Sequence, residues 1–405
     1  MKQISKGIRY SDSTFVNGNS VSYYDEPKNW DEFKVDAQNT NFSIDSTPPT
    51  NGNYEYLSYH PEASALQYGD KIYGNYVNGN FGVFELNSGD PLSDWGYRLP
   101  PLSKIVDGEY IYTRQCSKAS IKEEETVWNL NLGYANCNSN YTSNSSYHFA
   151  SDPPTSDKLY RTVKVDNTTG DILWTSPQVG LYGYDKYPGN FLSIDTNRDI
   201  IVQVTTVGYI SGEGDDIRYI GGLDTTTGDI IWENEYVLDE SRGGYNDPCP
   251  IDEDRGVVFH VVRDSDEFLH AVQCLDLTDG SLVWNSLEFW DPKIVSMAID
   301  SDKVYIAYTK EYEVGNGGVA AIDKDNGETI WERTNTVDFE PRLLKGAGDQ
   351  IIVLNGDTPQ YINSIDKNTG NKVWSAGSFG NVVKNFFVYN GNVYTSGGDI
   401  YKIGQ

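Results

Sequence analysis

Three short acidic clusters contain the residues of this chain that are best suited by type to bind a metal ion. Each cluster has two or three carboxylate or amide side chains within five positions, and such oxygen ligands suit Ca²⁺. None has the spaced ligand pattern that ends in a closing Glu. Because the clusters recur at corresponding places in successive segments, we interpret them first as hairpin turns and second as calcium loops. They are Asp195/Asn197/Asp199, Asp252/Glu253/Asp254 and Asp300/Asp302.

Groups for nucleophilic or hydrolytic catalysis are scarce. The sequence has neither a Gly-x-Ser-x-Gly motif nor a His-Glu-x-x-His motif. Its abundant Asp and Glu residues would indicate a glycosidase only with a measured separation between two carboxylates. His260 lies in the apolar run 257–262, where we expect a buried structural histidine. We therefore predict no catalytic residue among the four histidines, which are His60, His148, His260 and His270.

The four cysteines show no Cys-x-x-Cys pair and no zinc-site spacing. Cys116 and Cys137 lie in an Asn/Ser/Tyr-rich stretch, and a disulfide between them would add ~3 kcal/mol of stability in the loop-entropy model. The alternative is two free thiols in a reducing compartment. Cys249 and Cys274 fall on strands that are not neighbours, so we expect no bond between them, and Cys274 is predicted as a small core residue.

Surface recognition is the other chemistry that the composition suggests. Thirty tyrosines suit the recognition of protein or carbohydrate, although Tyr is equally common on half-exposed strands. Asn-x-Ser/Thr sequons mark candidate glycosylation sites on a chain that meets a glycosylation machinery. The sequons begin at Asn41, Asn140, Asn144 and Asn167.

A repeat of Asp, three residues, Gly, three residues and Trp organises the chain. Asp and Thr side chains bond their own backbone in tight turns, and Gly supplies the positive φ that such turns need. A short apolar strand precedes each Asp, and a second strand follows each Gly. The five copies are Asp166/Gly170/Trp174, Asp224/Gly228/Trp232, Asp276/Gly280/Trp284, Asp323/Gly327/Trp331 and Asp366/Gly370/Trp374.

The strand that follows each turn predicts how the sheets pack. An aliphatic residue stands directly before each Trp, and neighbouring strand positions point to opposite faces. We therefore expect both faces of each sheet to be buried at this point, as in radially stacked blades. The repeat Asp residues are 58, 52, 47 and 43 residues apart, close to the length of one four-stranded propeller blade.

Counting outward from the repeats predicts an all-β, seven-bladed β-propeller of four-stranded antiparallel blades, with eight blades as the alternative. A weaker unit ends at Trp95, and residues 116–157 are interpreted as a long loop inserted in the second blade. The last blade has three strands at the C-terminus, and we expect an N-terminal strand to complete it and close the ring. The predicted domains are an N-terminal arm at 1–29 and the propeller at 30–405.

The repeat resembles that of the PQQ-like propeller family, named after quinoprotein dehydrogenases. The stretch Trp30-Asp-Glu-Phe-Lys-Val-Asp-Ala-Gln-Asn-Thr40 is similar to a lead-in found in many secreted members, especially those of halophilic archaea, with Asn41 where the family usually has Gly. The resemblance implies a propeller, but enzymes, assembly scaffolds and binding proteins share it. Family enzymes usually carry two adjacent cysteines over the quinone and calcium ligands beside it. This chain has no Cys-Cys pair and no haem-attachment motif, so we expect no cofactor, apart from calcium as a secondary hypothesis.

The net charge of −28 argues against a nucleic-acid partner and against anionic membrane surfaces. Self-repulsion of this size is largely screened near 1 M salt, where the Debye length is about 3 Å, so a saline habitat is the preferred interpretation and an ordinary acidic secreted protein is the alternative. No apolar run approaches the ~20 residues of a membrane span, and residues 1–29 lack a signal-peptide pattern. We expect a non-catalytic binding or assembly module on a virion or cell surface of a halophile, where its partner is a host protein or glycan.

Overall fold

The computed structural model describes the protein as an all-β chain, and none of its described residues forms a helix. Accordingly, no helix in these ranges is long and apolar enough to cross a membrane. The described residues are 42–43, 47–59, 65–76, 79–99, 102–106, 109–113, 117–130, 139–141, 145–151, 160–177, 191–207, 216–238, 249–263, 269–286, 289–290, 292–310, 317–334, 341–355, 360–379, 383, 385–396 and 399–404.

The strands form eight antiparallel sheets, which we number as blades 1 to 8 along the chain. Blade 1 contains β3 (Leu66–Tyr68), β4 (Lys71–Asn75), β5 (Phe81–Glu85) and β6 (Pro91–Asp94). Blade 2 contains β7 (Leu102–Val106), β8 (Tyr110–Thr113), β9 (Ser117–Ser120) and β10 (Glu125–Asn129). Blade 3 contains β11 (Ser139–Tyr141), β12 (Ser145–Ser151), β13 (Tyr160–Asp166) and β14 (Ile172–Thr175). Blade 4 contains β15 (Phe191–Asp195), β16 (Ile200–Val207), β17 (Asp216–Asp224) and β18 (Ile230–Leu238).

The second half of the ring has the same pattern. Blade 5 contains β19 (Ile251–Asp252), β20 (Val257–Arg263), β21 (Leu269–Asp276) and β22 (Leu282–Asn285), with β23 (Phe289–Trp290) paired to β21. Blade 6 contains β24 (Pro292–Ile299), β25 (Lys303–Lys310), β26 (Gly317–Asp323) and β27 (Thr329–Thr334). Blade 7 contains β28 (Pro341–Ala347), β29 (Gln350–Asn355), β30 (Gln360–Asp366) and β31 (Lys372–Phe379). Blade 8 contains β32 (Asn385–Tyr389), β33 (Asn392–Ser396), β34 (Asp399–Ile403) and β2 (Tyr54–Tyr59).

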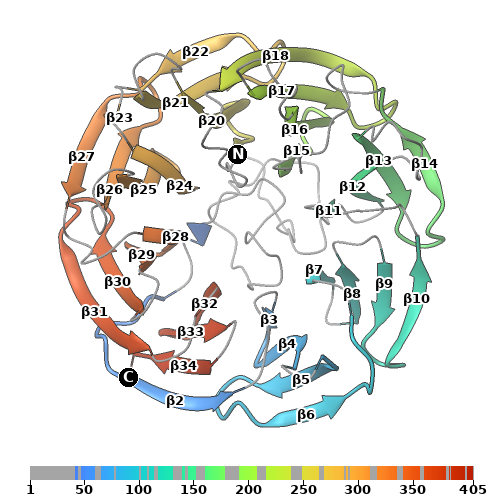
Figure 1. Cartoon of the computed structure of the whole chain (residues 1–405), viewed down its shortest axis with the longest axis vertical. Coiled ribbons are helices and arrows are strands. Elements are labelled where there is room, and N and C mark those ends of the chain that lie inside the picture. The colour runs from blue at the N-terminus through green and yellow to red at the C-terminus, as the bar shows by residue number, and fades with distance from the viewer. Residues whose placement is uncertain are drawn as a thin grey trace, which may run out of the picture.

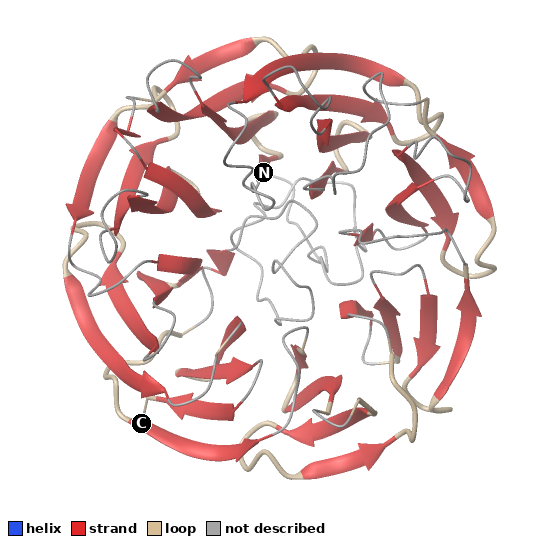
Figure 2. Cartoon of the chain, viewed as in Figure 1, coloured by secondary structure: helices blue, strands red, loops and turns tan. Residues whose placement is uncertain are grey.

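The blades stand around a ring, with the first strand of each near the centre and the last at the circumference (Figures 1 and 2). The apolar core is divided among the spaces between neighbouring blades. One cluster joins Val353 of blade 7 to Ala307 and Val319 of blade 6, and another joins Trp232 of blade 4 to Val258 of blade 5. Radial stacking therefore buries both faces of the inner strands.

The predicted propeller of four-stranded antiparallel blades is confirmed, and the number of blades is eight, our alternative, rather than seven. The difference lies in residues 116–157. Instead of one inserted loop, this stretch contributes β9 and β10, which complete blade 2, and β11 and β12, which begin blade 3. The turn between β9 and β10, Ile121–Glu124, has no Asp-x₃-Gly motif, and Glu124 itself takes the positive φ of 54°. The repeat pattern is thus absent at the turn where this blade closes.

The ring closes with an N-terminal strand, as predicted. β2 pairs antiparallel with β34 and supplies the outer strand of blade 8. A second short segment, β1 (Phe42–Ser43), runs parallel to β28 in blade 7. Two neighbouring blades near the C-terminus are therefore bound by residues from the other end of the chain. The predicted arm at 1–29 lies outside the described residues.

Candidate functional site

The outer turn of a blade joins its third and fourth strands, and the repeat Asp organises it. In blade 4 the Oδ1 atom of Asp224 accepts hydrogen bonds from the backbone N–H groups of Thr226 (2.7 Å) and Thr227 (2.8 Å). The N–H of Gly228 donates to the carbonyl of Asp224 at 2.8 Å, and Gly228 has a φ of +78°. The structure thus places Asp and Gly in the turn roles that their types favour. Gly170, Gly280, Gly327 and Gly370 have φ angles between +70° and +79°.

The repeat Trp residues of blades 3 to 6 each contact the outer turn of the next blade. The indole Nε1–H of Trp174 donates to the carbonyl of Thr225 at 3.0 Å. A Cβ atom built on Gly228 would lie 2.6 Å from the same ring, so only glycine lets the turn pack this closely. The other donor pairs are Trp232 to Leu277 (2.7 Å), Trp284 to Lys324 (2.9 Å) and Trp331 to Lys367 (3.1 Å). The repeat therefore forms a contact between successive blades, which we call the Trp–turn contact.

Two Trp–turn contacts fall where the sequence showed no complete repeat. Trp128, in the outer strand of blade 2, donates to the carbonyl of Asn167 at 3.3 Å and packs against Gly170. Trp374 donates to the carbonyl of Pro49 at 2.8 Å, so the N-terminal segment takes the place of an outer turn at the closure. Our sequence analysis missed Trp128, whose distance of 46 residues from Trp174 is one blade length.

The inner turns, which join the first two strands of a blade, contain the acidic clusters considered as calcium loops. Asp195, Asp252 and Asp300 are each at most 2 % exposed. The Oδ1 atom of each carboxylate accepts backbone N–H groups of its own turn. The Oδ2 atoms pair with cations, as between Asp195 and Arg198 at 2.8 Å. Both oxygens are thus engaged in turn bonding and ion pairing, and the geometry fits hairpin turns rather than calcium loops.

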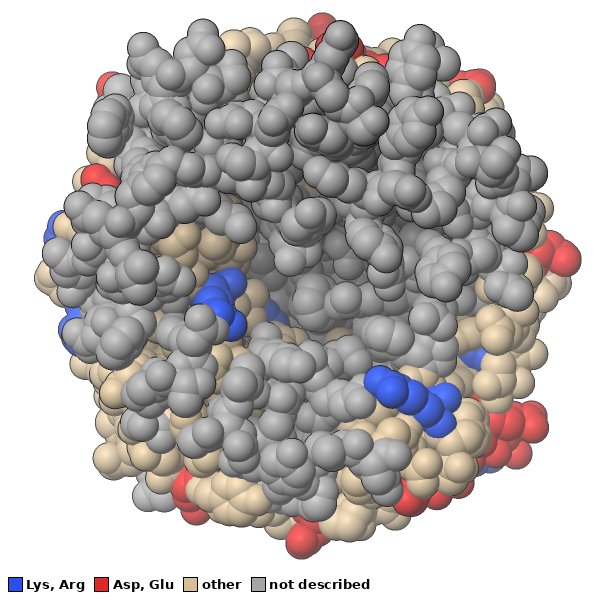
Figure 3. All heavy atoms as spheres, viewed as in Figure 1, with Lys and Arg blue, Asp and Glu red and all other residues tan. Residues whose placement is uncertain are grey.

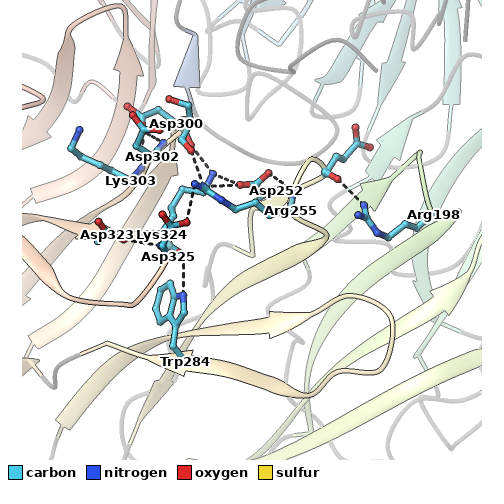
Figure 4. Close-up of polar contacts among 12 residues, drawn as sticks. Arg198, Asp252, Arg255, Trp284, Asp300, Asp302, Lys303, Asp323, Lys324 and Asp325 are labelled. Carbon is cyan, nitrogen blue, oxygen red and sulfur yellow. Dashed lines mark hydrogen bonds and ion pairs between the residues drawn. The ribbon is translucent and has the colours of Figure 1, made fainter. Parts of the chain in front are cut away.

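A series of polar contacts connects these inner turns from blade to blade (Figure 4). Arg198 of blade 4 donates to the carbonyl of Glu253 at 2.7 Å, and Arg255 of blade 5 donates to the carbonyl of Ser301 at 2.7 Å. Lys367 of blade 7 lies 3.2 Å from the carboxylate of Asp300 in blade 6. Arginine side chains thus connect the inner turns of blades 4 to 6, and Lys367, from the outer turn of blade 7, extends the series to that blade.

Lys324 is the most buried cation of this network. Its Nζ atom donates to the carbonyl of Asp300 at 2.6 Å and pairs with the carboxylate of Asp252, and its side chain is fully buried. Burial lowers the pKa of Lys324, although Asp252 works in the opposite direction. The carbonyl of the same residue accepts the Trp284 contact (Figure 4). Lys324 thus joins the inner-turn network to a Trp–turn contact.

The direction of the pKa shift differs from one turn carboxylate to another. The N–H groups of Thr169 and Thr168 lower the pKa of Asp166 in an outer turn. In the inner turns, burial raises the pKa of Asp195 despite Arg198. Burial also opposes the charge of Asp300, yet its N–H donors, Lys367 and Tyr305 together lower the pKa of that residue. All three directions follow from the balance between desolvation and local donors.

The aliphatic residues before the repeat Trp are exposed, and our expectation that both faces of the outer strand are buried is wrong there. The outermost strand has a neighbouring blade on only one side, so the face opposite Trp meets solvent. These side chains are between 44 % and 53 % exposed. We call them the rim belt: Val127, Leu173, Ile231, Val283, Ile330 and Val373.

The remaining predicted residues are scattered. Cys249 and Cys274 are buried and are not joined by a disulfide. Burial raises the pKa of Cys274 to about 12, which makes it unreactive. His260 is buried, with its Nε2 atom 3.0 Å from Oε1 of Gln273. Cys116, Cys137 and His60 lie outside the described residues, as do the side chains of His148 and His270. The predicted disulfide stays a prediction.

The predicted glycosylation sites gain little from the structure. Asn167 is buried, only 5 % exposed, and its carbonyl accepts from Trp128 and Lys118. A glycan on Asn167 would require the outer turn of blade 3 to open, so we withdraw this site. Asn41 and Asn144 lie outside the described residues. Asn140 lies in β11, and its side chain is outside the described part of the structure.

A closed ring of four-stranded blades joined by Trp–turn contacts defines this chain as a PQQ-like repeat β-propeller. The family model described as outer membrane protein assembly factor BamB matches residues 161–340 and 315–403. These matches cover more than half of the chain, and the protein belongs to this family. No curated protein sequence matches it.

Several solved structures share the fold at low identity. The quinohemoprotein alcohol dehydrogenase ADHIIG of Pseudomonas putida superposes with a TM-score of 0.62 at 10 % identity, covering 93 % of this chain and 80 % of that one. A europium-containing methanol dehydrogenase superposes with a TM-score of 0.62 at 12 % identity, covering 93 % of this chain and 91 % of that one. The computationally designed Ika8 protein superposes with a TM-score of 0.61 at 11 % identity, covering 89 % of this chain and 99 % of that one. At such identities these similarities establish the fold alone.

The described residues do not fit a quinone–calcium centre of the kind that the dehydrogenases suggest. No two cysteines are adjacent in the sequence. The buried inner-turn carboxylates that could serve as oxygen ligands are already paired with Arg198, Arg255, Lys324 and Lys367. Within the described ranges, no three His, Cys, Asp or Glu side chains are grouped to hold a metal ion.

Proposed function

We propose that this protein is a non-catalytic binding or assembly module that docks a protein partner on its rim belt. The observation that carries the proposal is the repetition of an exposed aliphatic side chain at one position of six successive outer strands. Leu92 in blade 1 and Tyr56 in blade 8 are also exposed and extend the row around the ring. Exposed apolar side chains that gather on one surface are typical of interaction sites.

The outer strands offer a second element of recognition. Each is the last strand of its sheet, so one side of its backbone has no ladder partner among the described strands, and such edges can accept an added strand. β18 and β31 are the longest of them, with nine and eight residues. A partner could therefore combine main-chain hydrogen bonds with aliphatic contacts.

Charge favours a partner that carries Lys and Arg beside its apolar contacts. The chain has a net charge of −28, and Figure 3 shows acidic side chains at several points of the circumference. A second copy of the chain or a nucleic acid would bring like charge. We place the protein in a saline environment as a surface-exposed structural component, such as a virion spike, a tail, a capsid decoration or a host-attachment protein. Its partner would be a protein of the assembly, or a host surface protein or glycan.

Site-specific photo-crosslinking in the native source tests the proposal. A photo-reactive amino acid at Val283, in the rim belt, should give one defined crosslinked protein. The matched control is the same amino acid at Asp279, which is exposed in the outer turn of the same blade and should give none. Equal labelling from both positions, or no crosslink from any rim position, would contradict the proposal.

The family match supports a second non-catalytic candidate, a scaffold in cell-envelope assembly. It rests on the description of the family as an outer membrane protein assembly factor. In that case the crosslinked partner would be an envelope protein, and deletion of the gene would lower the amount of assembled barrels in the envelope. Unchanged barrel assembly would reject this candidate and leave the rim-belt proposal intact.

A quinone- and calcium-dependent dehydrogenase is the catalytic alternative, supported by the fold similarity to two dehydrogenases. The test is to incubate the purified chain with pyrroloquinoline quinone and Ca²⁺. Retained quinone absorbance together with dye-linked alcohol oxidation would establish this alternative and overturn the non-catalytic proposal. Because the chain has no adjacent cysteines, we expect neither the quinone absorbance nor the alcohol oxidation.

A further inference from the structure

Two asparagine side chains of blade 7 are completely buried without a hydrogen-bond partner among the described residues. Asn355, at the end of β29, and Asn363, in β30, have no exposed surface. The Nδ2 and Oδ1 atoms of both amides are unpaired with any described protein group. Burial of an amide without a compensating hydrogen bond costs roughly 1–3 kcal/mol on mutational scales, and most buried polar groups in proteins therefore have a partner.

The strand register places the two amides on one face of the blade. Val353 lies directly opposite Asn363, and Asn355 lies opposite Tyr361. Opposed residues share a face, as do residues two apart along a strand. Asn355, Val353 and Asn363 therefore point to the same side, and the two amides are diagonal neighbours, with Cα atoms roughly 7–8 Å apart.

That face looks toward blade 6. Val353 packs in one apolar cluster with Ala307, Val319 and Ala321 of that blade. These three side chains carry neither donors nor acceptors, so they cannot satisfy the amides. The polar pair thus lies between two blades, opposite small aliphatic residues.

Blade 5 shows how the same position is satisfied elsewhere. Gln273 stands three residues before the repeat Asp276, as Asn363 stands three before Asp366. Opposite Gln273 is His260, and the two side chains bond at 3.0 Å. In blade 7 the residue opposite is Val353, so the equivalent amide has lost its protein partner.

We propose that Asn355 and Asn363 form a buried hydration site between blades 6 and 7, at which ordered water bridges the two amides. Together the side chains supply four N–H donors and two carbonyl acceptors. A buried water typically makes about three hydrogen bonds to such groups. Water suits an amide pair because it can accept from the N–H donors and donate to the carbonyl acceptors, whereas an ion would satisfy only one of these two kinds of group.

A high-resolution crystal structure of the intact chain tests the proposal directly. The expected result is at least one fully occupied water within hydrogen-bond distance of both amides. Two amides that bond only each other, or a site with no density, would overturn it.

A stability comparison gives an independent test. If water satisfies the amides, Asn363→Leu removes one hydrogen-bond partner of the water that also bonds Asn355. The midpoint of urea unfolding should then fall. If the amide is truly unsatisfied, the same substitution removes an unpaired polar group and raises the midpoint, which would overturn the proposal. Val353→His restores the blade 5 pairing, and we expect its crystal structure to lose the water nearest Asn363. Retention of that water with the imidazole bonded to Asn363 would show that the site does not depend on the missing partner.

Discussion

The inner and outer turns of blades 4 to 6 use the same Asp chemistry in different surroundings. In both, Oδ1 of an Asp accepts backbone N–H groups two or three residues further on. The outer-turn residue Asp224 is half-buried and its turn packs under the Trp of the preceding blade. The inner-turn residue Asp300 is 1 % exposed and pairs with Lys367 of the next blade.

The difference shows that burial decides what else a turn needs. A half-buried carboxylate is stabilised by its own turn and by solvent, whereas a buried one also needs a cation. The outer turns connect to the preceding blade through an indole and a glycine. Lys324 and Lys367, from the outer turns of blades 6 and 7, also pair with inner-turn carboxylates of the preceding blade. Neighbouring blades are therefore joined by two different kinds of interaction.

The largest effect should follow from the loss of a buried cation. Lys324→Met leaves the carboxylate of Asp252 with Arg255 alone, and breaking a buried pair on one side costs about 3 kcal/mol. The measurement is the free energy of unfolding from urea titration. In Lys324→Met with Asp252→Asn, the unpaired charge is gone and part of the loss should be recovered. A double variant as unstable as the sum of the two singles would contradict the role of the ion pair.

A smaller effect is expected from the glycine of an outer turn. Gly327→Ala places a non-glycine residue at a φ of +77° with its Cβ 2.6 Å from Trp284, and we expect a loss of about 2 kcal/mol. Gly69 of the inner turn in blade 1 is the matched control, since it has a φ of +59° and no atom within 4 Å of a built Cβ. Gly69→Ala should cost less in the same assay. Equal losses would mean that the Trp–turn contact adds nothing beyond the turn itself.

The outer-turn carboxylate should matter less than either. Asp224→Ala removes two hydrogen bonds to backbone N–H groups that water can reach, and the expected loss is about 1 kcal/mol. Asp224→Asn keeps an acceptor at the same place and should lose less. Thermal unfolding of the two variants would measure this order, and the reverse order would show that charge, not the acceptor, stabilises the turn.

The dependence on pH should separate two inner turns whose carboxylates shift in opposite directions, and this is the smallest effect. The folded state lowers the pKa of Asp300, so its contribution is present above the unfolded pKa and is lost as the pH falls below about 4. The folded state raises the pKa of Asp195, so its contribution is present at low pH and is lost as the pH rises. Asp300→Asn should flatten the acid limb of stability, and Asp195→Asn should steepen it. Parallel curves for the two variants would contradict the opposite shifts.

The fold could be predicted from the sequence wherever local chemistry recurs. The turns at Asp224 and Asp276 depend on residues within five positions, so their pattern is visible in the chain. The blade that ends at Trp128 was missed because its turn, Ile121–Glu124, uses neither Asp nor Gly. Glu124 takes the positive φ that a glycine has in the other outer turns, and a repeat pattern does not predict this.

The interactions between blades could not be predicted in the same way. The contact of Trp284 with the carbonyl of Lys324 and the pairing of Lys324 with Asp252 join residues 40 or more positions apart. The exposure of Leu173 was also missed, because a strand pattern shows alternation but not which sheet is outermost. These features arise from the closure of the ring and not from any one segment.

The most direct test of the account is the incorporation of a rim-belt variant into the native assembly. The variant changes Leu173, Ile231 and Val283 to Ser on three successive outer strands. A control changes the exposed residues Thr175, Glu233 and Asn285 of the same strands to Ser. Circular dichroism of each purified variant measures folding, and sedimentation of the native particle or envelope measures assembly. We expect the rim-belt variant to be folded but unassembled, and the control to be assembled. A folded rim-belt variant that assembles as well as the control would contradict the claim that this protein works through its rim.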